Sequence, residues 1–263
     1  MADADRRARE PIGRGTIVST ELVTYESKDD IAIITLNRPE KLNALSVDLG
    51  EALRAAWQRF QAGDDRVAIL ASSTPRAFTV GADLTHPPEI WRFTPSVGVE
   101  VDKPIIAAVD GYCVGGGVVL VNFCDLCVVA DTAVFSYPEA KVGVTGGLIS
   151  SLAARIPHKI AMEFVLYVGD ISAQRAYEVG MVNKVVPADQ LMDAAMEYAV
   201  KLKQHAPMVL STLKRFVGEV IAKGPSERAG IARRDTEAIL DSEDKLEGIA
   251  SFKEKRPPKF TGR

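Results

Sequence analysis

Residues 104–125 read PIIAAVDGYCVGGGVVLVNFCD, and the fold follows from this stretch. Its apolar run 105–109 predicts a strand, and Gly115, Gly116 and Gly117 then remove every side chain from a junction between a loop and a helix. A ligand atom can approach such a junction closely enough to accept hydrogen bonds from backbone N–H groups. The helix expected over 117–124 has no charged residue, which predicts that it is buried. The glycines alone are equally compatible with tight backbone packing and no ligand.

The composition is that of an ordinary globular protein. The chain has 263 residues, 47% of them hydrophobic and 25% charged, which favours one core with a smaller appended element. The 32 Lys and Arg residues against 35 Asp and Glu residues give a net charge of −3, which argues against a nucleic-acid-binding protein. No apolar run approaches the roughly 20 residues that cross a bilayer, so we expect a soluble, cytoplasmic protein with no membrane partner.

Histidine and cysteine positions argue against metal sites and disulfides. The three histidines lie far from one another and from the thiols in the sequence, at His86, His158 and His205. The three cysteines are an odd number in apolar sequence and indicate buried thiols in a reducing compartment, at Cys113, Cys124 and Cys127. Residues 1–19 combine arginines with acidic residues and lack an apolar segment, so we interpret them as a disordered tail rather than a targeting signal.

Short apolar runs alternate with helical patterns along most of the chain. Strands are expected over 21–25, 31–36, 67–71, 105–109, 126–130 and 182–186. Helices are expected over 46–62, 117–124, 148–156, 159–168, 172–179, 188–205, 207–222, 226–240 and 242–255. The segment 86–95 contains three prolines with Trp91 and Phe93, and we expect a mobile or irregular lid there. The alternation predicts an α/β protein with a layered, parallel core.

Three features of the sequence combine into a candidate catalytic site. Ala82 lies in the small-residue turn 81–84, Gly116 lies in the glycine run, and Glu139 ends the sequence Tyr-Pro-Glu. Two backbone N–H donors and one carboxylate suffice to polarise a thioester carbonyl and to move a proton at the neighbouring carbon. These three residues are therefore the candidate catalytic groups.

With these motifs the chain resembles the crotonase (enoyl-CoA hydratase/isomerase) superfamily. The resemblance covers nearly everything from about residue 20 to the end, and the set of motifs is specific although no single motif is. The matching segments are LNRP at 36–39, KLNAL at 41–45, AFTVGADL at 77–84, GYCVGGGVVLVNFCD at 111–125, YPE at 137–139, ISAQRAYEVGMV at 171–182, DSED at 241–244 and Gly248.

The resemblance implies a fold, an assembly and a class of substrate. The implied fold is a crotonase-like spiral of repeated ββα units over residues 20–200, followed by a C-terminal helical trimerisation region over residues 201–263. The implied assembly is a homotrimer or a hexamer made of two trimers. The implied substrate is an acyl-CoA thioester, so that coenzyme A belongs to the substrate and neither a separate cofactor nor a metal is expected.

The resemblance also implies roles for particular residues. The N–H groups of Ala82 and Gly116 would form an oxyanion hole for a thioester enolate, and Glu139 would be the acid/base. The residues expected to contact coenzyme A are Lys41, Val80, Ala82, Asp83 and Leu84, with Phe260 and its basic neighbours near the adenine end.

The main departure from the family pattern is Val119. Family hydratases carry one acid two positions after the last glycine of the run and a second acid in the Pro-Glu motif, whereas only Glu139 remains here. One carboxylate that takes a proton from one carbon and returns it to another suffices for isomerisation, so isomerisation or an atypical hydration of an enoyl-CoA is the leading function. Two alternatives stay open: hydrolysis or carbon–carbon cleavage of a keto thioester, and a non-catalytic acyl-CoA-binding protein.

Several polar residues near these motifs have more than one interpretation. Asn122, one turn after Val119, is a candidate to replace the missing acid, although an amide cannot act as a base near neutral pH. His86 has a suitable pKa for the same task, but a histidine on a surface loop is the simpler interpretation. Asp83 is expected to cap a following helix, and the alternative for Glu139 is a solvated loop carboxylate.

Overall fold

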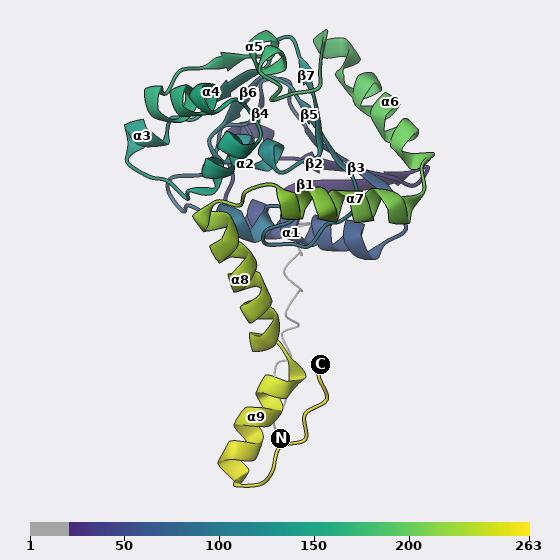
Figure 1. Ribbon diagram of the computed structural model, residues 1–263, viewed down its shortest axis with the longest axis vertical. Coiled ribbons are helices and arrows are strands. Elements are labelled where there is room, and N and C mark those ends of the chain that lie inside the picture. Colours follow the sequence, from purple (N-terminus) through teal and green to yellow (C-terminus); the bar gives the residue numbers. More distant parts are fainter. Residues whose placement is uncertain (1–20) are drawn as a thin grey trace, which may run out of the picture.

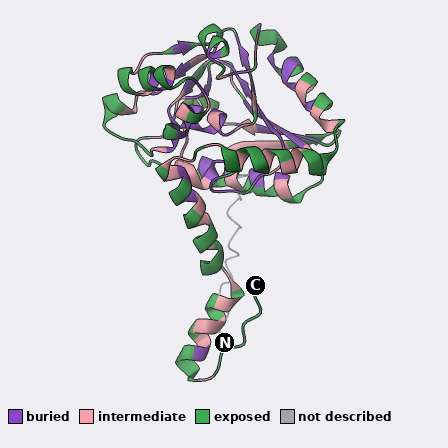
Figure 2. Cartoon of the chain, viewed as in Figure 1, coloured by how far each residue is buried: buried purple, intermediate pink, exposed green. Residues whose placement is uncertain are grey.

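The protein consists of a layered α/β body and a helical arm (Figure 1). The computed structural model describes residues 21–263, so the tail expected over residues 1–19 lies outside the described residues. Helices α8 (Pro225–Leu240) and α9 (Glu243–Glu254) form the arm and extend away from the body. Figure 2 shows that the strands of the body are buried whereas most of the arm is exposed. Within residues 21–263 no helix is long and apolar enough to cross a membrane.

The larger of two sheets has the strand order β1-β2-β3-β5-β7-β10. Its strands are β1 (Val23–Lys28), β2 (Ile31–Leu36), β3 (Val67–Ser72), β5 (Ile105–Val109), β7 (Leu126–Ala130) and β10 (Lys184–Val186). Only β1 and β2 are antiparallel, and all other neighbours in this sheet run parallel. The predicted parallel core is therefore confirmed.

The hairpin between β1 and β2 differs from the prediction. The expected strand ended at Tyr25, with a polar turn over 26–30, but β1 continues to Lys28, which pairs with Ile31. Asp29 and Asp30 both have positive φ values, 51° and 59°, as a two-residue hairpin turn requires. The tight turn allows three polar residues of the expected loop to join the ladder.

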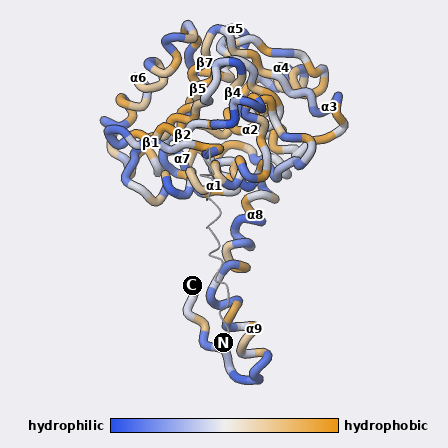
Figure 3. The backbone as a smooth tube through the Cα atoms, turned by 180° about the vertical axis from the view of Figure 1, so that it is seen from behind, coloured by the Kyte–Doolittle hydropathy of each residue, from blue (hydrophilic) through white to orange (hydrophobic). Residues whose placement is uncertain are grey.

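Helices cover both faces of the larger sheet. Helix α1 (Val47–Ala62) begins at the predicted N-cap Ser46 and packs Trp57 into the same cluster as Ala68 of β3. Helix α6 (Leu191–Lys203) packs on the opposite face, in a cluster with Ile69 of the same strand. Burial on both faces explains why these strands are apolar throughout rather than alternating, and Figure 3 shows the hydrophobic segments concentrated in the body.

The smaller sheet shows that the body is built from repeated ββα units. Its strand order is β4-β6-β8-β9, and its strands are β4 (Ala77–Thr79), β6 (Tyr112–Val114), β8 (Val134–Ser136) and β9 (Ile171–Ser172). Each pair β3/β4, β5/β6 and β7/β8 places its first strand in the larger sheet and its second in the smaller one. A helical element follows each pair: η2 (Ile90–Phe93), α2 (Gly116–Asn122) and α3 (Glu139–Val142). Successive units thus advance by one strand in both sheets.

The chain is mostly helical after α3, although two helices are less regular than predicted. The helix expected over 148–156 is the 3-10 helix η3 (Leu148–Ala154), in which Ser150 and Ser151 donate back to carbonyls three residues earlier, a bond that favours a tighter turn. The helix expected over 159–168 is α4 (His158–Met162) followed by a π turn, η4 (Glu163–Tyr167). The remaining elements are η1 (Pro39–Lys41), α5 (Ala173–Glu178), η5 (Ala188–Gln190) and α7 (Pro207–Val220).

The three cysteines are free thiols in the interior. Cys113 of β6 and Cys127 of β7 are buried, and Cys124 is partly buried. Burial raises the pKa of all three thiols, because desolvation disfavours the thiolate. The prediction of buried, unpaired thiols is confirmed.

Lys103 joins the end of α1 to the segment that leads into β5. Its Nζ donates to the carbonyl oxygens of Phe60, Gly63 and Asp65 at 2.8, 2.6 and 2.9 Å. These carbonyls lie at the C-terminal end of α1, where backbone acceptors lack partners within the helix and a cation is favoured. Lys103 thus caps the C-terminal end of α1 and holds the start of β5, the strand that precedes the glycine run, against it.

Replacing Lys103 tests this contact. We expect Lys103→Met to lower the free energy of unfolding by about 2 kcal/mol, because three carbonyl groups lose a charged donor while the aliphatic chain is kept. Urea denaturation followed by circular dichroism measures the change, with the exposed Lys28→Met as a matched control. A loss no larger than that of the control would contradict the assignment.

Candidate active site

The topology of the smaller sheet brings the three candidate catalytic residues to one edge. Strands β4, β6 and β8 are adjacent and parallel, so their carboxyl ends lie at the same edge of the sheet. Ala82 follows β4, Gly116 follows β6 and Glu139 follows β8, each by two or three residues. Residues from three separate ββα units therefore meet there.

The backbone at Ala82 is fixed by a short parallel bridge to Leu45. Leu45 donates its N–H to Gly81 O and accepts from Asp83 N, both at 2.8 Å. In a parallel bridge the N–H of the middle residue, here Ala82, points away from the partner strand. No backbone acceptor within residues 21–263 takes this N–H, nor that of Gly116 at the start of α2. Two free backbone donors are thus present at the edge of the sheet.

Each glycine of the run is required for a different reason. A Cβ atom on Gly115 would lie 2.7 Å from Oε1 of Glu139. Gly115 also has φ 54° and ψ −111°, a backbone conformation that residues with a Cβ atom rarely adopt. A Cβ on Gly116 would lie 2.9 Å from Leu45 and 3.0 Å from Ile90. Gly117 leaves no room for a Cβ against Thr79 of β4. Tight packing accounts for Gly117, whereas Gly115 makes room for the candidate acid/base.

The carboxyl group of Glu139 is enclosed rather than solvated. Glu139 is half-buried at the start of α3, and its Oε2 is buried without a hydrogen-bond partner within residues 21–263. Desolvation raises its pKa to about 7, with a smaller opposing effect from its own backbone N–H. The burial of Oε2 argues against the alternative of a solvated loop carboxylate. A carboxyl group with this pKa can both accept and donate a proton near neutral pH.

The residues expected to contact coenzyme A divide into those at this edge and one far from it. Val80, Asp83 and Leu84 lie beside Ala82, with Leu84 exposed, and exposed Lys41 lies in the loop whose Leu42 O accepts from Val80 N. The backbone N–H of Asp83 is already taken by Leu45 O. This edge of the sheet is thus accessible at Leu84 and Lys41.

The side chain of Asp83 does not cap a helix, because a turn follows it rather than a helix. Its carboxylate accepts from the Thr85 hydroxyl at 2.6 Å and from Arg38 Nη1 at 3.0 Å. These two bonds lower the pKa of Asp83 to about 2. Asp83 therefore remains a charged group that ties the turn after β4 to the loop that contains Arg38.

Phe260 lies on the arm, away from the other candidate residues. The exposed Phe260 ring packs against Gly248 of α9, where a Cβ would lie 3.6 Å from the ring. Its neighbours Lys259, Thr261 and Gly262 donate their backbone N–H groups to the carboxylates of Glu247 and Asp244 on α9. The C-terminal segment is thus held to the arm, which extends away from the body (Figure 1).

Three positions bear on the missing acid: Val119, Asn122 and His86. Val119 is buried in the main core cluster, as the simplest interpretation of an apolar helix predicts. Asn122 donates to the Ser151 hydroxyl at 2.8 Å, at the opposite end of α2 from Gly116. His86 is exposed on the loop after Asp83. Neither Val119 nor Asn122 therefore supplies a second carboxylate.

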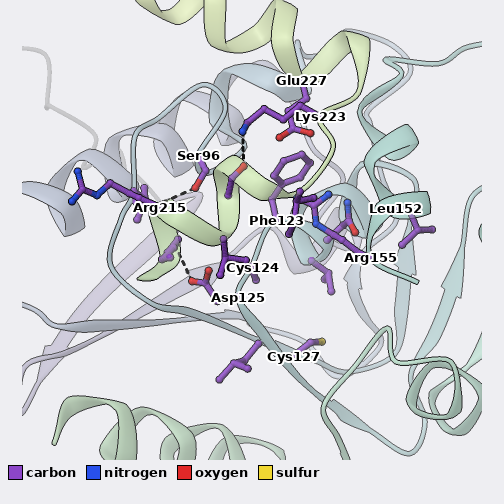
Figure 4. A pocket seen from close by; sticks show the side chains of 18 of the residues that line it. Ser96, Phe123, Cys124, Asp125, Cys127, Leu152, Arg155, Arg215, Lys223 and Glu227 are labelled. Carbon is purple, nitrogen blue, oxygen red and sulfur yellow. Dashed lines mark hydrogen bonds and ion pairs between the residues drawn. The ribbon is translucent and has the colours of Figure 1, made fainter. Parts of the chain in front are cut away.

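A cavity of about 580 Å³ lies at the far end of α2 (Figure 4). Its walls include Asn122, Phe123 and Cys124 from the end of α2, with Arg155 and Glu227 nearby. The guanidinium of Arg155 lies 4.9 Å from the centre of the Phe123 ring. None of Ala82, Gly116 and Glu139 lines this cavity, so it is distinct from the candidate catalytic site.

Sequence reasoning missed the role of Asn43. This fully buried residue donates from its side-chain amide to the carbonyls of Ala77 and Phe78 at 3.3 and 3.2 Å, and its Oδ1 accepts from Arg38 N at 2.8 Å. It thereby fixes the loop 38–44 against β4, where the Ala82 turn begins. The signal for it was a polar residue between Leu42 and Ala44, which sequence alone assigns to any loop.

Two sheets of repeated ββα units, with free backbone donors and one carboxylate at the ends of parallel strands, define a protein of the crotonase class. The family model described as enoyl-CoA hydratase/isomerase matches residues 26–90 and 96–263. The chain therefore belongs to the enoyl-CoA hydratase/isomerase family of enzymes in the crotonase superfamily. Among residues 21–263 no group of three or more His, Cys, Asp or Glu could hold a metal ion.

Individual relatives have more specific names. The chain is 34% identical over 254 residues to a probable enoyl-CoA hydratase of Mycobacterium tuberculosis, covering 92% of this chain and 99% of the relative. It is 35% identical over 250 residues to a carnitinyl-CoA dehydratase of Salmonella paratyphi B, covering 88% and 94%. A solved carnitinyl-CoA dehydratase from Mycobacterium avium superposes with a TM-score of 0.72 at 31% identity, covering 93% of this chain and 100% of that one.

The raised pKa of Glu139 predicts a pH-dependent contribution to stability. The carboxyl group has a pKa of about 7 when folded and 4.5 without the fold, so between these values the folded state binds the additional proton. Stability of the unsubstituted protein therefore falls as the pH rises from about 4.5 to 7, and Glu139→Gln removes this loss. The melting temperature of Glu139→Gln relative to the unsubstituted protein should rise between pH 5 and pH 8, whereas exposed Glu163→Gln shows no such trend. A pH-independent difference would contradict the enclosed carboxyl group.

Proposed function

We propose that the chain isomerises the double bond of an enoyl-CoA thioester, with Glu139 as the single acid/base and the N–H groups of Ala82 and Gly116 as the oxyanion hole. The observation that carries the proposal is the enclosed Glu139 carboxyl group, whose Oε2 has no partner among the described residues. Its pKa of about 7 suits a group that must take up and release a proton in the same turnover.

The reaction needs one proton and two carbon positions. Glu139 takes a proton from the α-carbon of a β,γ-unsaturated thioester, and the C–H electron pair enters the conjugated system to give a dienolate. The enolate oxygen accepts hydrogen bonds from Ala82 N and Gly116 N, each worth about 3 kcal/mol in the transition state. The electron pair then forms a C–H bond at the γ-carbon with the proton from Glu139, which leaves the double bond between the α- and β-carbons.

Hydration is the second candidate, favoured by the hydratase and dehydratase names of the relatives. Adding water requires one group to take a proton from water and another to deliver a proton to the α-carbon. Val119 supplies an apolar side chain where the first of these acids would stand, and Asn122 lies at the other cavity. These placements favour isomerisation over hydration.

Coenzyme A would lie along the exposed edge after β4. The residues grouped there are Lys41, Val80, Ala82 and Leu84. The N–H of Asp83 would not bind coenzyme A, because it donates to Leu45 O. Asp83 would instead hold the turn through its ion pair with Arg38. Phe260 belongs to the C-terminal segment that is held to the arm, so it would contact coenzyme A of a neighbouring subunit. The coenzyme A site would then be completed across a subunit boundary.

The exposed arm supports assembly into a homotrimer or a hexamer. Apolar side chains that a monomer would leave in water include Leu246, Ile249 and Phe252 of α9, with Phe252 85% exposed. Helix α7 likewise exposes Met208 and Val220. Large exposed apolar side chains grouped on helices in this way are typical of subunit interfaces.

The Glu139→Gln variant tests the proposed chemistry. We expect kcat to fall by about 10²- to 10⁴-fold, because the amide cannot carry the proton, while the affinity for a saturated acyl-CoA is unchanged. Isomerisation of 3-enoyl-CoA substrates, and exchange of deuterium from solvent into the α- and γ-carbons, measure the effect. Exposed Glu163→Gln is the control, and full activity of Glu139→Gln would refute the assignment.

The pH profile separates the two candidate reactions. Isomerisation starts with the ionised carboxylate, so kcat/KM should rise with pH through about 7. Hydration with Glu139 as the proton donor needs the protonated form, so kcat/KM should fall above the same pH. A rising profile with 3-enoyl-CoA, and no water addition to 2-enoyl-CoA, is the result expected from the geometry.

Assembly through the arm is tested by placing a charge on its apolar face. We expect Phe252→Asp to shift the protein from trimer or hexamer to monomer, because a carboxylate would be desolvated in the interface. Light scattering after size-exclusion chromatography measures the mass. Lys253→Asp, at the neighbouring exposed position, is the control and should assemble normally. A monomeric unsubstituted protein would contradict the proposed assembly.

A further inference from the structure

Ile90 forms a wall of the candidate site at Gly116. Its Cδ1 lies 3.0 Å from the position that a Cβ on Gly116 would occupy, and Leu45 Cδ1 lies 2.9 Å from the same position. Leu45 is fixed by its bridge to Ala82, but Ile90 belongs to the single 3-10 turn η2. One turn is too short to hold a fixed position by itself, so the place of Ile90 depends on the contacts of η2 with its neighbours.

Helix α1 holds one side of η2. The buried Phe93 ring packs where Gly50 of α1 lacks a side chain, and a Cβ there would lie 2.6 Å from the ring. Arg92 Nε pairs with Glu51 of α1 at 3.3 Å. The turn is closed by Thr94, whose hydroxyl donates to Ile90 O at 2.8 Å. The segment expected to be a mobile or irregular lid is thus irregular, and it is held against the body by these contacts.

Helix α8 of the arm holds the other side. Arg92 Nη1 pairs with Glu237 at 2.8 Å, and Arg233 Nη1 pairs with Glu89 at 3.1 Å. The guanidinium groups of Arg92 and Arg233 lie over the Trp91 ring, 5.5 and 5.8 Å from its centre.

A third contact brings α8 against the same turn. A Cβ on Gly230 would lie 3.3 Å from Trp91 Cβ and 2.6 Å from Val97, so the helix approaches η2 with no side chain between them. Contacts at positions 230, 233 and 237 follow one face of α8, because they are three and four residues apart. This face is therefore docked along η2.

The start of α8 also contacts the segment that follows Glu139. Gly147 leaves no room for a Cβ against Ser226, and Gly224 leaves none against Ser150. Helix α8 therefore contacts two segments next to candidate site residues. One is η2, which carries Ile90, and the other is the start of η3, which follows Glu139 in the chain.

We propose that Trp91 and Arg92 are positioning residues, which hold η2 between α1 and α8 so that Ile90 stays against Gly116 and shapes the oxyanion side of the site. The inference rests on the proposed function, because it takes Gly116 N as a donor to the enolate. Neither residue touches the reacting atoms. Each acts through Ile90, and the arm helix α8 thereby contributes to the geometry of the active site.

The two ion pairs between α8 and η2 should contribute to different extents to holding the helix in place. Arg233 and Glu89 are 62% and 53% exposed, so water screens their interaction. Arg92 and Glu237 are only 29% and 30% exposed. The N–O distance in this pair is 2.8 Å, against 3.1 Å in the pair of Arg233 and Glu89. Arg92 also pairs with Glu51, which makes it the link between the two helices. Removing Glu237 should therefore have a larger effect than removing Arg233.

The test uses acetoacetyl-CoA, a thioester whose enolate absorbs in the near ultraviolet. An oxyanion hole stabilises the bound enolate and lowers the pH at which it forms. We expect Glu237→Gln to weaken enolate binding by about 10-fold, less than the ~100-fold that a 1 Å misplacement can cost, and Arg233→Gln to weaken it less. Arg234→Gln is the matched control, because Arg234 lies on the same helix and pairs with its neighbour Asp235 at 2.9 Å.

Two further variants distinguish positioning from general destabilisation. Arg92→Lys keeps the charge but loses the forked geometry that reaches two carboxylates, so it should give an intermediate enolate affinity. Gly230→Ala separates α8 from η2 by a single methyl group and should weaken enolate binding in the same direction as Glu237→Gln. Melting temperatures and the mass of the assembly should stay close to those of the control for the variants of Arg92, Arg233 and Glu237. A lower melting temperature of Gly230→Ala would reflect the 2.6 Å approach of the added methyl group to Val97.

The outcomes separate this inference from the proposed function. No bound enolate with the unsubstituted protein would overturn the proposed oxyanion hole, and this inference with it. Enolate binding by the unsubstituted protein that is equal in Glu237→Gln, Arg233→Gln and Arg234→Gln would overturn the inference alone. Loss of enolate only in proportion to lost stability would likewise overturn it, because a purely structural role has that signature.

Discussion

The approach of the Gly115 backbone to the Glu139 carboxyl group is the contact on which the site depends. Gly115 donates its N–H to Ser136 O at 2.9 Å, which joins β6 to the end of β8, and its carbonyl accepts from Val119 N to start α2. The same residue thus fixes the direction of the helix that begins with Gly116 and leaves the space in which Glu139 lies. Any side chain at this position would disturb donor and acid together.

The regular elements of the body could be predicted because their signals are local. The strands at 31–36 and 105–109 have the predicted bounds, and α1 starts at the predicted cap. The order of strands could not be predicted from such signals, since pairs such as Val185 and Val129 are distant in the chain. The 3-10 and π turns after Gly147 were also beyond prediction, because they reflect serine bonds and packing rather than periodicity.

The candidate site was predictable in its residues but not in its electrostatics. The glycine run and the Tyr-Pro-Glu sequence pointed to Gly116 and Glu139, but the pKa of about 7 arises only when the fold removes water from the Glu139 carboxyl group. Likewise, the sequence gives no hint that Leu45 occupies the N–H of Asp83, or that Glu237 pairs with Arg92 across 145 positions. Contacts of this kind need the tertiary structure, because neither partner carries a local signal for the other.

The burial of Cys113 and Cys127 makes these two thiols a reporter of local unfolding. A thiol reacts with a disulfide dye as the thiolate and only when the dye can reach it, and burial opposes both for Cys113 and Cys127. These two thiols should therefore react slowly in the folded protein, whereas Cys124, in the wall of the cavity, is only partly buried. The rate at which Cys113 and Cys127 are labelled would measure how often β6 and β7 separate from the core.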